Sequence, residues 1–236
     1  MRAGSSAIAR LFSWTGALLF VLSLVYFLVA YLTWFGAAAS AGTISAAVTW
    51  NVTLFTAFAL HHSLFARARL RAWVARVIPP ELERSLYVWI ASLLFVLVCG
   101  GWRPVPGIAW QADGVAVWSL RAVQAAGLWI IVRSARILDV WGLAGVTTGG
   151  RAGEAGGEFK AIGPYGWVRH PIYAGWFLFV FAASPMTMTR LVFAIVSGVY
   201  LLIAIPFEER TLRAGSDGAY ERYMAAVRWR LVPGVY

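Results

Sequence analysis

Residues 171–184 (PIYAGWFLFVFAAS) and 190–206 (RLVFAIVSGVYLLIAIP) are two apolar runs separated by a short break. Ser184 and Pro185 form this break, because proline cannot continue a helix and also restricts the residue before it. Each run is apolar enough to lie in lipid, although the first is short for a helix that spans a bilayer. The two runs therefore predict a tight helical hairpin inside a membrane.

Polar side chains flank this hairpin at the two ends that it brings together. Pro171 suits the first turn of a helix, which places Arg169 and His170 at the entrance of the first helix. Glu208 and Glu209 follow the second helix, so we expect the acidic pair to meet Arg169 and His170 at one membrane boundary. Ionisable residues at such a depth are costly and are usually functional. The alternative is a structural salt bridge from Arg169 to a glutamate that closes the hairpin.

The rest of the chain is also built for a membrane. Of its 236 residues, 61% are hydrophobic and only 13% are charged, whereas a soluble domain has about a quarter charged residues. Further apolar runs lie near residues 11–35, 44–66, 85–101 and 115–135. Each is long enough to span a bilayer, and the first is too long for a removed signal peptide. We predict an all-α, polytopic membrane bundle of about six spans, forming one domain over residues 1–236, with residues 1–141 as its N-terminal spans.

The net charge of +10 fits this topology better than it fits nucleic-acid binding. Arginine and lysine gather in alternate loops, around residues 67–84, 133–169 and 210–230. The loops between them, at 36–43 and 102–114, hold few basic residues. This alternation is the positive-inside pattern. It predicts that both termini and both polar clusters face the cytoplasm, and that no nucleic acid is bound.

His61 and His62 form a second polar feature, near the cytoplasmic end of the second span. Adjacent residues on a helix cannot both face one metal ion, and Cys99 is the only cysteine, so we predict no metal site. A buried structural histidine is one interpretation. A proton acceptor, or a group that orients the substrate, is the other.

Two segments in the second half of the chain, residues 142–163 and 217–229, need interpretation. Residues 142–163 hold eight glycines but no Gly-Lys-Ser/Thr, so they are not a phosphate loop. They are either a flexible linker or a mobile cover over a site. Residues 217–229 predict a surface helix with Asp217 as its N-cap, whose apolar stripe serves packing. That stripe consists of Tyr220, Tyr223, Met224 and Val227.

Several short motifs occur together over residues 157–233. They are Gly163-Pro-Tyr165, Val168-Arg169-His170-Pro171-x-Tyr173-x-Gly175, Glu208-Glu209-x-x-Leu212, Tyr220-x-x-Tyr223 and Pro233. In combination they resemble the C-terminal half of isoprenylcysteine carboxyl methyltransferases and related membrane methyltransferases. The resemblance implies that this half binds S-adenosylmethionine.

The resemblance also implies which residues hold this cofactor. In the family the cofactor is held at positions matching Tyr165, His170, Pro171, Tyr173 and one glutamate of the pair, and the segment before the Gly-x-Tyr lines the site. The full expected cofactor-binding set is Glu158, Phe159, Lys160, Gly163, Tyr165, Arg169, His170, Pro171, Tyr173, Glu208 and Glu209. Arg169 could pair with the cofactor's carboxylate and a glutamate with its ammonium. The expected catalytic residues are His61, His62, Arg169 and Glu208.

The N-terminal half narrows the resemblance to one branch. Leu60-His61-His62-Ser63-Leu64-x-Ala66-Arg67, Pro79-Pro80-x-x-Glu83-Arg84-Ser85-x-Tyr87 and Trp102-Arg103-Pro104 are similar to the methanethiol S-methyltransferase branch. That branch also includes membrane proteins linked to nitrite and nitric oxide respiration. The prenylcysteine enzymes place an arginine about one turn before the glutamates to hold substrate. Residues 201–207 read LLIAIPF and contain none, which suits a small or neutral acceptor.

The resulting functional hypothesis is transfer of a methyl group from S-adenosylmethionine to a small thiol. Methanethiol, giving dimethyl sulfide, is the preferred acceptor. One alternative acceptor is a prenylated cysteine carboxylate or another lipid-like group, which would enter from the lipid bilayer between helices. A non-enzymatic alternative is an accessory protein of nitrite or nitric oxide respiration. We expect the protein in a bacterial inner membrane, with its active site facing the cytoplasm.

Overall fold

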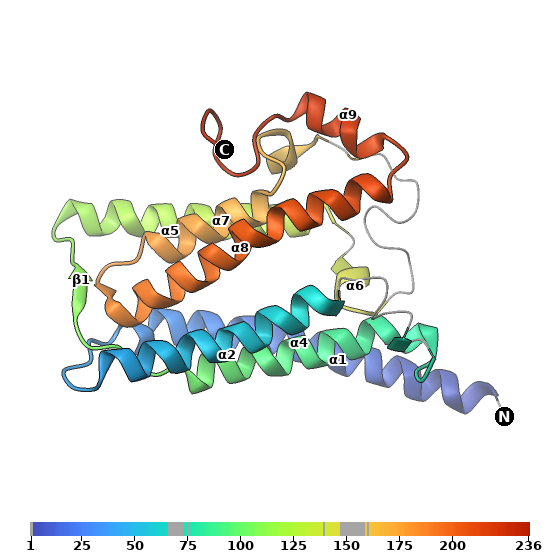
Figure 1. Cartoon of the computed structure of the whole chain (residues 1–236), viewed down its shortest axis with the longest axis horizontal. Coiled ribbons are helices and arrows are strands. Elements are labelled where there is room, and N and C mark those ends of the chain that lie inside the picture. The colour runs from blue at the N-terminus through green and yellow to red at the C-terminus, as the bar shows by residue number, and fades with distance from the viewer. Residues whose placement is uncertain (1, 66–72, 75, 139, 147–158, 160) are drawn as a thin grey trace. The chain divides into compact units, whose positions relative to one another are not determined.

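The computed structural model of the chain is almost entirely helical (Figure 1). It describes residues 2–65, 73, 74, 76–138, 140–146, 159 and 161–236. The chain forms two compact units. The first unit comprises residues 1–106 and 141–149, and the second comprises residues 107–140 and 150–236.

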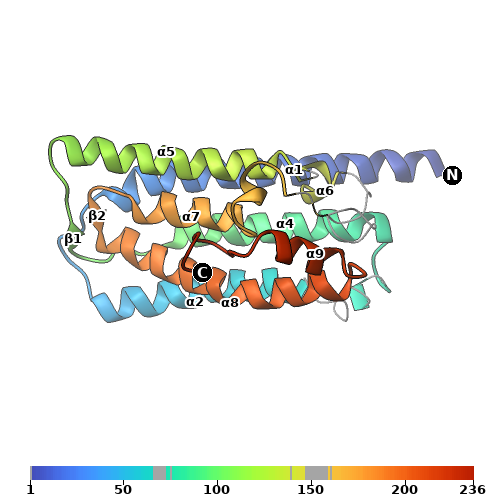
Figure 2. The ribbon, with the colours of Figure 1, turned by 90° about the horizontal axis from the view of Figure 1, so that it is seen from above.

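Three long helices make the first unit. They are α1 (Arg2–Leu32), α2 (Ile44–Phe65) and α4 (Pro80–Gly101), accompanied by the short η1 (Trp34–Gly36) and by α6 (Val140–Leu143), which begins at the unit boundary. Helix α4 packs against both α1 and α2 and lies between them (Figure 2). Aromatic rings fill the α1–α4 contact, where Phe27 meets Phe95 with ring centroids 5.5 Å apart. Such pairs of apolar helices are the expected way to bury non-polar surface in this kind of fold.

The second unit contains the predicted hairpin. Its elements are β1 (Ile108–Trp110), α5 (Val115–Ala135), η2 (Gly163–Gly166), α7 (Pro171–Phe181), β2 (Met186–Thr187), α8 (Met188–Ala214) and α9 (Ala219–Ala226). The break predicted at Ser184 and Pro185 lies between α7 and α8, as expected. The short strand β2 follows it and pairs antiparallel with β1, with Ile108 opposite Thr187 and Trp110 opposite Met186.

Helix α7 lies between α5 and α8 in both views (Figures 1 and 2). Two glycines bring α5 and α7 close together. A Cβ atom added at Gly175 would lie 2.6 Å from the carbonyl oxygen of Gly127, and one added at Gly127 would lie 2.6 Å from the carbonyl oxygen of Gly175. Small residues allow such close backbone approach between membrane helices. The glycine pair therefore fixes where α7, and the site at its start, lies on α5.

Within the described part of the chain, five helical segments are long and apolar enough to cross a membrane. They are Ala7–Gly36, Ile44–Phe65, Leu82–Gly101, Val115–Ala135 and Met188–Ala214. Helix α7 is apolar but only 11 residues long, which gives it a length of about 17 Å, against about 30 Å for a hydrocarbon core. The helical membrane architecture is thus confirmed, and α7 is the short segment that the sequence indicated.

The surface helix at the C-terminus differs from the prediction at its start. Helix α9 begins at Ala219 rather than after an Asp217 cap, because Asp217 and Gly218 both adopt positive φ (44° and 79°) and turn the chain. Ser216 provides the capping hydrogen bond instead, since its Oγ accepts from the backbone N–H of Tyr220 at 3.2 Å. The predicted packing stripe is confirmed, with Tyr220, Tyr223 and Val227 buried in one cluster.

Candidate functional site

The start of α7 is shaped by a short turn. Gly163 adopts φ +54°, a conformation that favours glycine, and Pro164 follows it in the first turn of η2. Pro171 occupies the first position of α7, so the missing proline N–H costs no helical hydrogen bond. Arg169 and His170 are therefore held immediately before the helix, and both are buried.

Glu209 is the centre of the polar cluster. The residue is 1% exposed, and Arg169 Nε donates to its Oε1 at 2.8 Å. Arg230 donates to its Oε2 through Nε at 3.1 Å and Nη2 at 2.9 Å. His170 Nε2 lies 3.4 Å from Oε1. This buried carboxylate thus holds two guanidinium groups and an imidazole, so the expected salt bridge that closes the hairpin is present.

Glu208 has a different environment. Its side chain is 42% exposed, and Oε2 accepts from the Tyr173 hydroxyl at 2.8 Å. His170 Nδ1 is 3.7 Å from the same oxygen. The rings of His170 and Tyr173 are stacked, with centroids 5.4 Å apart and planes within 4°. Glu208 therefore offers an accessible carboxylate beside two stacked aromatic faces.

The C-terminal segment, residues 227–230, binds the same cluster through hydrogen bonds. Arg169 Nη1 donates to the carbonyl oxygens of Val227 and Arg228. The backbone N–H groups of Arg169 and His170 donate to the carbonyl oxygens of Trp229, at 2.8 Å, and Arg230, at 2.9 Å. The contact between Arg230 and Glu209 was not predicted from the sequence. No spacing signal links residues 21 apart on different elements, and the arginine instead counted toward the basic loop.

An aromatic group lies between η2 and α9. The Tyr223 hydroxyl donates to the carbonyl oxygen of Tyr165 at 2.8 Å. Phe159 packs edge to face on Tyr220, with ring centroids 5.0 Å apart, and stacks on Tyr223 at 6.0 Å. Burial raises the pKa of Tyr223 to about 12 and raises that of Tyr165 further, so both hydroxyls stay protonated at neutral pH.

The second unit thus brings together most of the predicted cofactor-binding residues. Arg169, His170, Tyr173, Glu208 and Glu209 are linked by the contacts above. Pro171 and Gly163 shape the backbone, while Tyr165 and Phe159 join the aromatic group. Two members of the predicted set, Glu158 and Lys160, lie outside the described residues, as does most of the glycine-rich segment.

His61 and His62 belong to the first unit, in the last turns of α2. The Tyr87 hydroxyl and His62 Nδ1 share a hydrogen bond of 2.7 Å. The ring of His61 stacks on Tyr87, with centroids 5.6 Å apart and planes within 13°. Both ring nitrogens of His61 are buried and have no hydrogen-bond partner. The two histidines therefore have distinct roles in the packing, and only His62 is tied to a neighbouring hydroxyl.

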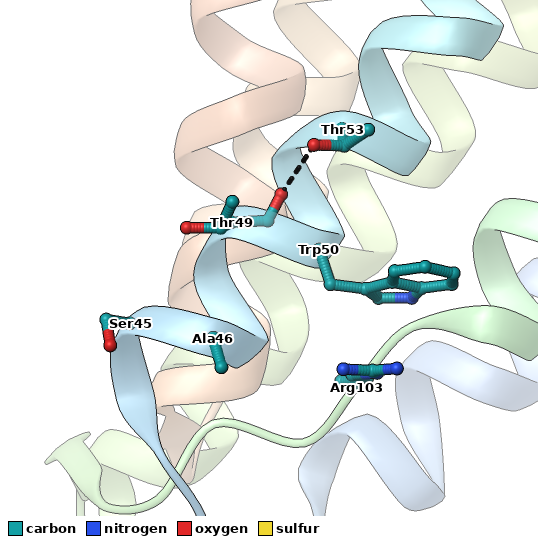
Figure 3. A pocket seen from close by; sticks show the side chains of 6 residues that line it. All are labelled: Ser45, Ala46, Thr49, Trp50, Thr53 and Arg103. Carbon is teal, nitrogen blue, oxygen red and sulfur yellow. Dashed lines mark hydrogen bonds between the residues drawn. The ribbon is translucent and has the colours of Figure 1, made fainter.

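A shallow hollow of about 400 Å³ lies at the other end of α2, lined by Ser45, Ala46, Thr49, Trp50, Thr53 and Arg103 (Figure 3). The Arg103 guanidinium lies flat against the Trp50 ring, 4.4 Å from its centroid. Asn51 fixes the backbone of Arg103 through two hydrogen bonds, of 2.9 and 2.8 Å. The hollow contains no acid or base other than Arg103, and His61 lies about two turns beyond Thr53, the nearest lining residue on α2. It is therefore a poor candidate for the chemistry.

Comparison with known proteins agrees with these motifs. Residues 152–214 match the isoprenylcysteine carboxyl methyltransferase family. Similar proteins include methanethiol S-methyltransferase 2 of Bradyrhizobium diazoefficiens, which is 35% identical over 80% of this chain and 74% of its own length. The methanethiol S-methyltransferases of Crocosphaera subtropica and Mycobacterium tuberculosis are 38% and 36% identical, over 75% and 80% of this chain and 71% and 80% of their own lengths. No solved structure matches the chain significantly.

These relatives match 75–80% of the chain, and they favour the enzyme over the non-enzymatic alternative. The five apolar spans agree with an integral membrane protein that moves a methyl group from a donor to a small acceptor. The chain belongs to the isoprenylcysteine carboxyl methyltransferase-like membrane methyltransferases, on the branch whose named members are methanethiol S-methyltransferases.

Proposed function

We propose that this enzyme transfers the methyl group of S-adenosylmethionine to a small thiol, with methanethiol as acceptor and dimethyl sulfide as product. The choice of methanethiol as acceptor rests on the identity of 35–38% to three enzymes named for methanethiol S-methylation. S-adenosylmethionine supplies an electrophilic methyl group on a sulfonium, and the C–S bond breaks as the thiolate sulfur forms a new S–C bond.

The polar cluster of the second unit suits this cofactor. Glu208 presents an exposed carboxylate to a ligand ammonium, already oriented by the Tyr173 hydroxyl at 2.8 Å. The Tyr173 ring, which is partly exposed and stacks on His170, offers an electron-rich face for a sulfonium or an adenine ring. These residues position the methyl donor and exclude water from it, which is the main help that an in-line methyl transfer needs.

Arg169 and Glu209 have a supporting part in this proposal. The guanidinium of Arg169 is occupied by Glu209 and by two carbonyl oxygens of the C-terminal segment. Glu209 is in turn enclosed by Arg169, Arg230 and His170. Direct pairing of Arg169 with the cofactor's carboxylate stays a prediction, while the geometry favours Arg169 and Glu209 as the frame that orients His170 and the neighbouring Glu208.

Helix α8 has no arginine one turn before Glu208, and this bears on which methyl acceptor the enzyme uses. One turn before the glutamates α8 carries Ala204 and the fully buried Ile205, where the prenylcysteine enzymes use an arginine to hold a carboxylate. An apolar lining suits a small neutral thiol. Such a thiol must lose its proton before attack, and His61 or His62 is the proposed proton acceptor. If replacing both with alanine leaves the rate and its pH profile unchanged, this part of the proposal is wrong.

The proposed location follows from charge and composition. We place the protein in a bacterial inner membrane with the cofactor site on the cytoplasmic side, because the basic loops and the C-terminal segment carry most of the arginines. The cofactor then enters from the cytoplasm, and an apolar acceptor can arrive from the lipid phase between helices.

The first prediction tests the cofactor with a matched pair of acidic residues. In calorimetric titration of the detergent-solubilised protein with S-adenosylhomocysteine, Glu208→Gln should weaken binding by about tenfold or more, because it removes one charge-assisted contact. Glu221→Gln is the control, since Glu221 is exposed on α9 and outside the site. Equal affinities for both variants would remove Glu208 from the site.

The acceptor is tested in the same preparation by headspace detection of dimethyl sulfide from methanethiol. The match of residues 152–214 to the isoprenylcysteine carboxyl methyltransferases supports a prenylated cysteine carboxylate as the competing acceptor. Turnover of a farnesylcysteine analogue without turnover of methanethiol would reverse the choice between them.

A further inference from the structure

A buried hydroxyl group in the second unit is left without a partner. Tyr220 is 2% exposed, and its hydroxyl oxygen has no hydrogen bond. Among the described residues of this unit, Ser134 is the other buried side chain in that state. A buried hydroxyl without a partner loses its hydrogen bonds to water and gains none in return. Such groups are rare in folded proteins and need an explanation.

Tyr223 provides the contrast within the same helix. It is also buried in the aromatic group, but its hydroxyl donates to the carbonyl oxygen of Tyr165 at 2.8 Å. Tyr220 and Tyr223 pack against each other, with ring centroids 5.8 Å apart. Packing alone therefore explains both rings but only one hydroxyl. A phenylalanine would fill the place of Tyr220 equally well if its hydroxyl had no further role.

The unpaired hydroxyl is close to the charged cluster. Burial raises the pKa of Tyr220 above its ordinary value, and the negative charge of Glu209 adds to this effect while Arg169 opposes it. The hydroxyl therefore remains protonated at neutral pH and can donate a hydrogen bond. Phe159, from the segment expected to line the cofactor, packs against the Tyr220 ring. The donor thus lies beside Phe159 and is acted on by the charges of the Glu209 cluster.

We propose that the Tyr220 hydroxyl binds the methyl donor by donating a hydrogen bond to an acceptor atom of the adenosyl ligand. This inference rests on the proposed function, and it gives the Tyr220 hydroxyl a ligand-binding role in addition to the packing role of the ring. In the ligand-free protein the unpaired Tyr220 hydroxyl lowers the free energy of unfolding. In the complex the same hydroxyl donates a hydrogen bond to the ligand.

The test uses Tyr220→Phe in the full chain, measured without and with S-adenosylhomocysteine. Without ligand, we expect the variant to unfold at a temperature about 2–4 °C higher than the wild type, because an unpaired buried hydroxyl is gone. With ligand, calorimetric titration should give a dissociation constant about threefold to tenfold larger, because one hydrogen bond is lost. A purely structural tyrosine would not give these opposite signs.

Tyr223→Phe is the matched control. Its hydroxyl is paired in the ligand-free protein, so this variant should unfold at a lower temperature than the wild type. The inference is overturned if Tyr220→Phe binds S-adenosylhomocysteine as tightly as the wild type, or if it lowers the ligand-free unfolding temperature, as loss of a water-mediated bond would do. Failure of the wild type to bind the ligand would instead overturn the proposed function.

Discussion

Two adjacent carboxylates in this enzyme have opposite environments. Glu209 is 1% exposed and is surrounded by four cationic or ionisable groups, whereas the Glu208 side chain is 42% exposed and meets a tyrosine hydroxyl. Neighbouring helical residues point about 100° apart, so one carboxylate can face the protein while the other faces a ligand. We therefore propose that Glu209 stabilises the architecture and that the exposed Glu208 is available to bind a ligand.

This division gives a prediction about stability. Glu209→Gln should lower the free energy of unfolding by about 3 kcal/mol or more, because it leaves the buried Arg169 and the partly exposed Arg230 beside a neutral group. Glu208→Gln should change it by less than about 1 kcal/mol, since that side chain is largely solvated. Thermal unfolding in detergent, followed by tryptophan fluorescence, measures both. Equal losses for the two variants would contradict the assigned roles.

The sequence predicted part of this residue-level arrangement. Convergence of Arg169 and His170 with the acidic pair followed from hairpin geometry, because the two ends of a helical hairpin must meet. The sequence did not separate Glu208 from Glu209, since their side-chain directions depend on how α8 is rotated against α7. Arg230 was missed for a similar reason, because it reaches Glu209 through a C-terminal segment without periodic pattern.

At the scale of elements, the short helix α7 is the part that positions the site. It begins with Pro171, directly after His170, and its far end turns back into β2 and α8. Gly127 and Gly175 let its backbone approach α5 so closely that no Cβ fits between them. The sequence revealed the length of α7 but not its packing partner, since a glycine in an apolar run carries no information about which helix it will meet.

A prediction follows for this glycine contact. Gly175→Ala should lower the free energy of unfolding by about 1–3 kcal/mol, because its Cβ would lie 2.6 Å from a backbone oxygen and force the helices apart. The affinity for S-adenosylhomocysteine should fall as well, since α7 carries His170 and Tyr173. Gly215→Ala is the control, because the added Cβ would lie 3.5 Å from its nearest neighbour, an ordinary contact. If both variants behave alike, the glycine pair does not position the site.

At the scale of the whole molecule, hydropathy predicted the helical membrane architecture, whereas the orientation expected from the charges stays a prediction. Five of the apolar runs are helices long enough to span a membrane, and the sixth is α7. The prediction of one domain over residues 1–236, with its cofactor half at 157–233, stays a prediction, whereas the chain folds as two compact units. Helix α5 belongs to the second of these units, because it packs on α7. The hydrophobic periodicity of a single helix does not indicate which distant helix it will contact, so the packing of α5 on α7 could not be predicted from the sequence.

The orientation in the membrane is the prediction that concerns the whole chain. Cys99 is buried and is the only cysteine, so Cys99→Ala gives a background without thiols. On that background Ala225→Cys, exposed on α9, should react with a membrane-impermeant maleimide only in inverted vesicles, and Asp113→Cys, exposed before α5, only in intact spheroplasts. The basic residues crowd the C-terminal segment and are sparse near Asp113, which is why these sides are expected. The reverse labelling would place the Glu208 carboxylate on the side of the membrane where S-adenosylmethionine is not made, and the proposed cofactor would then have no route to the site.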